Sequence, residues 1–142
     1  MEQDFESLAK DIVVEKLRGA ENSPALAAEI ARKIAISALS GEGTRPDPRA
    51  AISGACRGAM NGTLLIEGDL AKTAVALLGK MAAVATEAHL DPADCMTWAM
   101  EGIAPAVKLA PGGAGDAVGT AIEENFMGAG PVFADLLRTS GA

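Results

Sequence analysis

The shortage of aromatic side chains is the feature that most restricts how this chain can fold. Three Phe, one Trp and no Tyr make up 3% of the 142 residues, whereas 49% of the residues are hydrophobic. A chain of this length buries roughly two-thirds of its unfolded surface, enough for one domain with its own core. We therefore expect residues 1–142 to form a single domain whose core consists of small aliphatic side chains.

Hydrophobic periodicity predicts an all-α fold. From Phe5 to Leu17, apolar residues recur at spacings of three and four, which places them on one helical face. Ser23 and Pro24 then supply an N-cap hydroxyl and a proline at the first helical position of a second helix, which is expected to end near Leu39. These two helices form a charged hairpin over residues 1–45, closed by a linker of helix breakers at 41–46.

The rest of the chain repeats its helix-start signals. Asp-Pro occurs at 47 and again at 91, and Gly-Asp occurs at 68 and again at 115. We interpret residues 46–88 and 89–142 as two helical hairpins of common origin, the second followed by a short C-terminal helix. Asp47, Asp69, Asp91 and Asp116 are the expected N-caps, and the helix after Asp69 is expected to run unbroken to about Ala88. The prediction is six to seven helices, packed as a compact bundle or a short array of tandem hairpins.

Glycine spacing indicates helices that approach closely. Gly54, Gly58 and Gly62 are four residues apart and share one ridge, which Gly102 and Ala106 continue in the second repeat. Each glycine inside a helix costs about 1 kcal/mol relative to Ala, so a close contact must offset the loss. That contact is either with another copy or with a helix of the same chain. Because residues 46–142 carry few charges, we favour the first interpretation: a non-enzymatic interaction or scaffold protein that forms a homo-oligomer through this ridge.

The methionines suggest an alternative function. Met60, Met81 and Met100, together with Trp98, could line an apolar cavity between the hairpins, because Met side chains adapt to irregular spaces. The protein would then carry a small apolar ligand or a lipid, and these four residues would be the ligand-binding residues.

A third hypothesis concerns the only histidine. His89 precedes Asp91, Asp94 and Cys95, residue types that can ligate a metal or take part in catalysis. The same residues also suit a helix junction, with His89 in the last turn of one helix and Asp91 capping the next. We favour the junction, and therefore predict no metal, no cofactor and no catalytic residue.

The charge balance restricts the partners. A net charge of −7 disfavours both a phosphate backbone and an anionic membrane surface, so we expect no nucleic acid partner. Every window of about 18 residues contains a charge, which argues against a transmembrane span. The first residues lack the basic and apolar parts of a signal peptide, and Cys56 and Cys95 form no ligand motif. A cytoplasmic protein with reduced thiols is the expectation.

Overall fold

The computed structural model describes residues 5–18, 23–40, 47–110, 112 and 114–139, and this part of the chain consists of helices and turns. The linker at 41–46 and part of the turn at 110–115 lie outside the described residues. The described part contains eight helices: α1 (Phe5–Leu17), α2 (Ser23–Ser40), α3 (Pro48–Leu65), α4 (Leu70–Gly79), α5 (Met81–Ala88), α6 (Pro92–Leu109), α7 (Ala114–Asn125) and α8 (Ala129–Thr139). The all-α prediction is confirmed.

The eighth helix arises from a break that the sequence analysis did not predict. The helix expected over residues 70–88 is divided at Lys80 into α4 and α5. Gly79 stabilises a helix poorly, and the backbone N–H of Lys80 bonds to the carbonyl of Leu77 in place of a regular α-helical bond. At the break, the Lys80 ammonium lies 3.2 Å from the Glu29 carboxylate of α2, a contact distant in sequence.

Three of the four predicted aspartate N-caps are confirmed. The carboxylates of Asp47, Asp69 and Asp91 each accept a hydrogen bond from a backbone N–H in the first turn of α3, α4 and α6. Asp116 lies inside α7, because that helix begins two residues earlier, at Ala114. There it still complements the positive end of the helix dipole.

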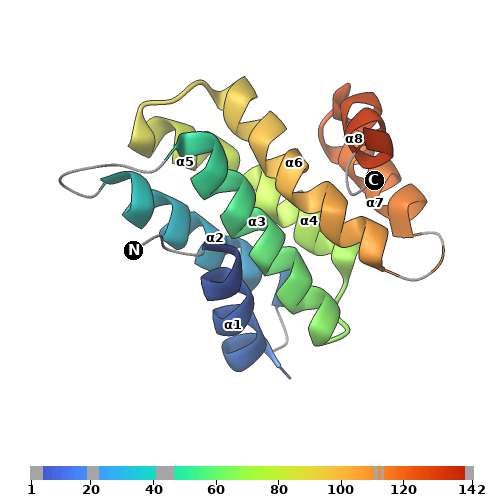
Figure 1. Ribbon diagram of the computed structural model, residues 1–142. Coiled ribbons are helices and arrows are strands. Elements are labelled where there is room, and N and C mark those ends of the chain that lie inside the picture. The colour runs from blue at the N-terminus through green and yellow to red at the C-terminus, as the bar shows by residue number, and fades with distance from the viewer. Residues whose placement is uncertain (1–4, 19–22, 41–46, 111, 113, 140–142) are drawn as a thin grey trace.

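Helix α3 is the centre of the bundle (Figure 1). It contacts α1, α2, α4 and α6, so the N-terminal hairpin packs directly on the first repeat. Helices α3 and α6 have equal length and pack against each other. Helices α4 and α7 also pack against each other. Helices α7 and α8 lie at the other side of α6 from α1. Within the described residues, no helix is long and apolar enough to cross a membrane.

The core consists mainly of small side chains, as the composition requires. Buried alanines line α2, α3 and α6, with Ile, Leu, Val and Met between them. Phe133 of α8 is the largest fully buried side chain, whereas Phe5, Trp98 and Phe126 are partly buried. A core of this kind depends on short distances between backbones rather than on bulky side chains.

Candidate functional site

The glycine ridge of α3 is covered by α1 of the same chain. A Cβ atom added to Gly58 would lie 2.1 Å from the carbonyl oxygen of Glu6, and one added to Gly62 would lie 2.8 Å from Val13. Gly54 faces Phe5 in the same way. Packing within the chain, the second interpretation of the spacing, therefore accounts for this ridge without another copy.

The second-repeat part of the ridge is also internal. A Cβ atom on Gly102 would lie 2.2 Å from the carbonyl oxygen of Ser53, so α6 meets the backbone of α3 there. Ala106, one turn further, is fully buried. The expected interface residues are thus covered by the chain's own helices.

The methionines predicted to line a cavity belong to the core. Met60, Met81 and Met100 are at most 3% exposed, and Trp98 packs partly buried against the same cluster. The two grooves described below are lined by other residues. These four residues fill space between helices, and the ligand hypothesis needs a different location.

His89 forms a helix junction. It ends α5 in the left-handed conformation (φ 59°, ψ 48°), and the N–H of the next residue, Leu90, donates to the carbonyl of Ala85 at 2.8 Å. This is the Schellman arrangement of a helix C-terminus. Asp91 then caps α6 through the N–H of Ala93 at 2.7 Å. Among the described residues, no three His, Cys, Asp or Glu side chains form a group that could hold a metal ion.

Neither thiol is placed for chemistry. Cys56 and Cys95 are both free and buried. Burial raises the pKa of Cys56 to about 12 and also raises the pKa of Cys95. Because the thiolate is the nucleophilic form, both groups are poorly reactive at neutral pH.

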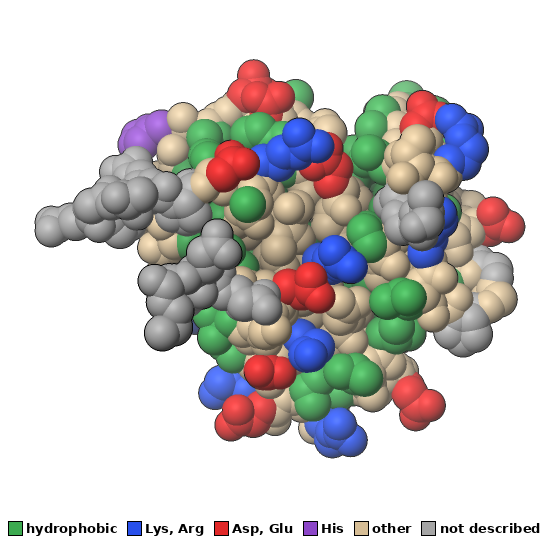
Figure 2. All heavy atoms as spheres, in the orientation of Figure 1, with side chains coloured by type: hydrophobic (Ala, Val, Ile, Leu, Met, Phe, Trp, Pro, Cys, Tyr) green, Lys and Arg blue, Asp and Glu red, His purple; other side chains and the backbone are tan. Residues whose placement is uncertain are grey.

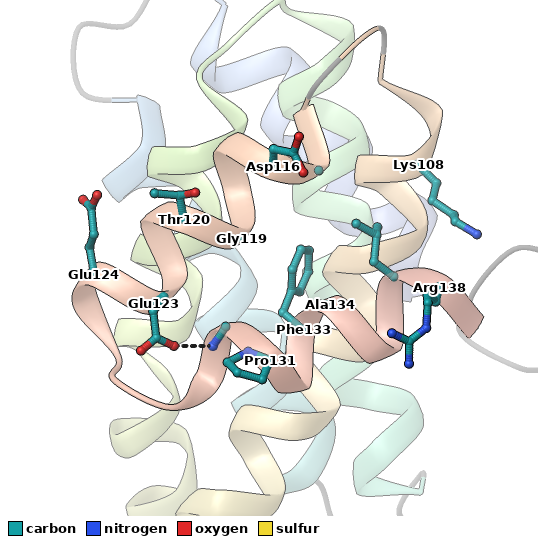
Figure 3. A pocket seen from close by; sticks show the side chains of 13 residues that line it. Lys108, Asp116, Gly119, Thr120, Glu123, Glu124, Pro131, Phe133, Ala134 and Arg138 are labelled. Carbon is teal, nitrogen blue, oxygen red and sulfur yellow. Dashed lines mark hydrogen bonds between the residues drawn. The ribbon is translucent and has the colours of Figure 1, made fainter.

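A large hollow lies between α7 and α8, beside the end of α6 (Figure 3). Its volume is about 880 Å³. We call it the α7–α8 groove, and its lining residues are Lys108, Gly115, Asp116, Gly119, Thr120, Glu123, Glu124, Gly130, Pro131, Phe133, Ala134, Leu137 and Arg138. The interior is mainly apolar, and the charged side chains lie around its edge.

Two glycines of α7 allow α8 to lie close to it along the α7–α8 groove. Gly115 and Gly119 are one turn apart and both face α8, since added Cβ atoms would lie 2.8 Å from Leu137 and 3.9 Å from Phe133. The Phe133 ring points from α8 toward Gly119 and forms part of the wall (Figure 3). Two glycines at helical spacing opposite an apolar helix are the sequence signal for this site, whereas Gly115 was interpreted only as part of a helix-start signal.

Glu123 joins the two walls of the groove. Its carboxylate accepts hydrogen bonds from the backbone N–H of Gly130 at 2.9 Å and from that of Gly128 at 3.1 Å (Figure 3). The carboxylate thereby caps the N-terminus of α8 and complements its dipole.

A second, smaller groove is polar. It has a volume of about 450 Å³ and lies where α1, α3, α6 and α8 meet. Arg49 binds both carboxylate oxygens of Glu101, at 2.7 and 2.8 Å, and Arg57 lies 3.3 Å from Glu6. Figure 2 shows basic side chains beside acidic ones on this face. These charges neutralise one another across helix boundaries, so this groove has the features of a structural contact.

Neither a protein-family model, nor a curated protein, nor a solved structure matches this chain at a significant level.

Proposed function

We propose that this protein binds a small apolar ligand in the α7–α8 groove and catalyses no reaction on it. The observation that carries the proposal is the groove itself. Its volume of about 880 Å³ falls within the range of about 300–1,000 Å³ that is usual for small-molecule sites. An apolar interior with a few polar groups at the edge is also typical of such sites.

The charges around the groove favour an uncharged ligand. Arg138 forms an ion pair with Asp135, and the Glu123 carboxylate already accepts bonds from the α8 backbone. Lys108 and Asp116, of opposite sign, both belong to the lining. With Glu124, the lining carries two basic and three acidic side chains, so an anionic head group would be disfavoured. An apolar body would be removed from water against Phe133 and Leu137.

This proposal keeps the ligand-carrier hypothesis of the sequence analysis and moves its site. The Met60, Met81, Met100 and Trp98 cluster is replaced by the lining of the α7–α8 groove. The self-association hypothesis loses its original warrant, because the glycine ridge is occupied by α1.

Filling the groove tests the proposal. Gly119→Leu places a side chain inside it, at a position where an added Cβ meets only Phe133 at van der Waals distance. Gly79→Leu is the matched control, because a Cβ at this helical glycine has nothing within 4 Å. The probe is Nile Red, an uncharged apolar dye, titrated by fluorescence, with native mass spectrometry of the purified protein for any ligand that copurifies.

We expect saturable binding to the wild type and to Gly79→Leu, and binding at least tenfold weaker to Gly119→Leu. Equal binding by the two variants would place the dye elsewhere and reject the groove as the site. No saturable binding by the wild type, with no copurified ligand, would reject the proposed function.

A further inference from the structure

Helix α8 has few attachments to the bundle. Among the described helices it contacts only α6 and α7, and Phe133 is its single buried residue. Hollows lie along both sides of it, since Leu137 lines the α7–α8 groove and Leu136 lines the polar groove. Ala129, Leu136 and Leu137 also pack against the core, but only in part. Because α8 is the last described helix and has one fully packed anchor, we expect it to separate from the bundle as a unit.

The turn that leads into α8 has the features of a hinge. Gly128 adopts a φ of 93°, and Ala129 N–H donates to the carbonyl of Phe126 at 2.9 Å to close the turn. Met127, in the middle, is 94% exposed, and Val132 in the first turn of α8 is 42% exposed. Two apolar side chains therefore lie in solvent beside the point where the chain would open.

We propose that two copies of this chain exchange their α8 helices. The α8 of each copy packs on α6 and α7 of the other, so that Phe133 enters the same position and Glu123 accepts from the Gly130 N–H of the other copy. The contacts of α8 with α6 and α7 are rebuilt between the copies, and only those of the turn, such as the bond from Ala129 N–H to the Phe126 carbonyl, are given up. Such an exchange is therefore a low-cost route to a dimer. The partner is a second copy of this chain, because its α8 has the shape that already packs on the surface of α6 and α7.

The hinge supplies a contact that the exchanged dimer has and the single chain lacks. In the exchanged dimer the two opened hinges meet, and each exposed Met127 gains an apolar neighbour that it lacks in one chain. Each α7–α8 groove then takes one wall from each copy. The exchange does not depend on the proposed ligand, and it uses a surface unrelated to the glycine ridge of α3.

Gly128 controls the equilibrium in this scheme. A φ of 93° is readily adopted by glycine but disfavoured for other residues, whereas an opened hinge removes this requirement. Gly128→Ala should therefore shift the equilibrium between closed and open hinge about tenfold toward the open form. Because the dimer contains two open hinges, its association constant should rise about a hundredfold. Gly112→Ala is the control, since Gly112 also has a positive φ (29°) but lies in the turn before α7.

The first measurement is size-exclusion chromatography with light scattering over a range of concentrations. We expect a minor dimer in the wild type, a greatly increased dimer in Gly128→Ala, and no change in Gly112→Ala. A monomeric Gly128→Ala over the full range, or an equal increase in both variants, would overturn the exchange of α8.

The second measurement does not depend on the Gly128 variant being folded. Gly115 and Leu137 face each other across the boundary of α7 and α8, since an added Cβ on Gly115 would lie 2.8 Å from Leu137 Cδ2. Cysteines at these two positions would therefore face each other. One preparation carries Gly115→Cys and the other Leu137→Cys; they are mixed, concentrated and oxidised, and non-reducing electrophoresis follows. Exchange predicts a disulfide-linked dimer in the mixture that is absent from either variant alone. A mixture that stays unlinked, or links no more than the single variants, contradicts the proposal.

Discussion

Gly58 lies so close to the carbonyl oxygen of Glu6 that a Cβ atom between them would be 2.1 Å from that oxygen. The neighbouring Gly62 is similarly close to Val13, so α1 and α3 meet backbone to backbone over two turns. A chain with few aromatic side chains obtains its core contacts in this way, because short side chains make contacts only when their backbones are near.

The Gly58 contact predicts that Gly58→Ala destabilises the fold. Although Ala favours a helix by about 1 kcal/mol over Gly, the clash with backbone must displace α1, and overpacking of this kind costs about 1–3 kcal/mol. We expect a net loss, measured as a lower urea midpoint. Gly79→Ala is the control and should raise the midpoint, because its Cβ meets open space. Equal stability of the two variants would mean that α1 is not seated on Gly58.

Glu123→Ala should loosen α8 while leaving the bundle folded. The substitution removes the acceptor for the N–H groups of Gly128 and Gly130, and loss of a helix cap typically costs about 1 kcal/mol. Hydrogen exchange read residue by residue should show faster exchange in α8 than in the wild type and unchanged exchange in α3. Glu124→Ala is the matched control. Similar exchange in the two variants would indicate that the Glu123 carboxylate does not hold α8.

The part of the structure that could be predicted from sequence is the local part. Asp47 and Asp91 cap their helices through N–H groups two residues away, so their role depends only on neighbouring residues. Glycine spacing correctly indicated a close approach, but it could not show that α1 is the partner of Gly58, since that choice depends on how distant helices dock. For the same reason the cap that Glu123 gives to α8 was missed: its carboxylate has to reach Gly130 across a turn.

Burial of Cys56 predicts a pH dependence at alkaline pH. The pKa of this thiol is about 12 in the folded protein and about 9.0 in the absence of burial. The unfolded chain therefore releases this proton between these values while the folded chain keeps it, so the free energy of unfolding falls as the pH rises above about 9. Below pH 9 the thiol is neutral in both states and contributes no slope. Cys56→Ala should show a weaker decline in urea titrations at pH 8 to 10.5, and parallel curves for the two proteins would contradict the assignment.

Phe133→Ala tests whether α8 is a separate unit of stability. If α8 unfolded only together with the rest of the core, truncation of a buried Phe would lower the free energy of unfolding by about 3–5 kcal/mol. Phe133 is instead the only buried residue of α8, and among the described helices α8 contacts α6 and α7 alone. The variant can therefore undock α8 and keep α1 to α7 folded. The loss in global stability then cannot exceed the docking free energy of α8. We expect α8 amides to lose their protection from hydrogen exchange while α3 and α6 amides retain most of theirs. Phe126→Ala, which truncates a partly buried ring just before the hinge, is the comparison. A uniform loss of protection in all helices of Phe133→Ala would show instead that α8 belongs to the same cooperative unit as the core.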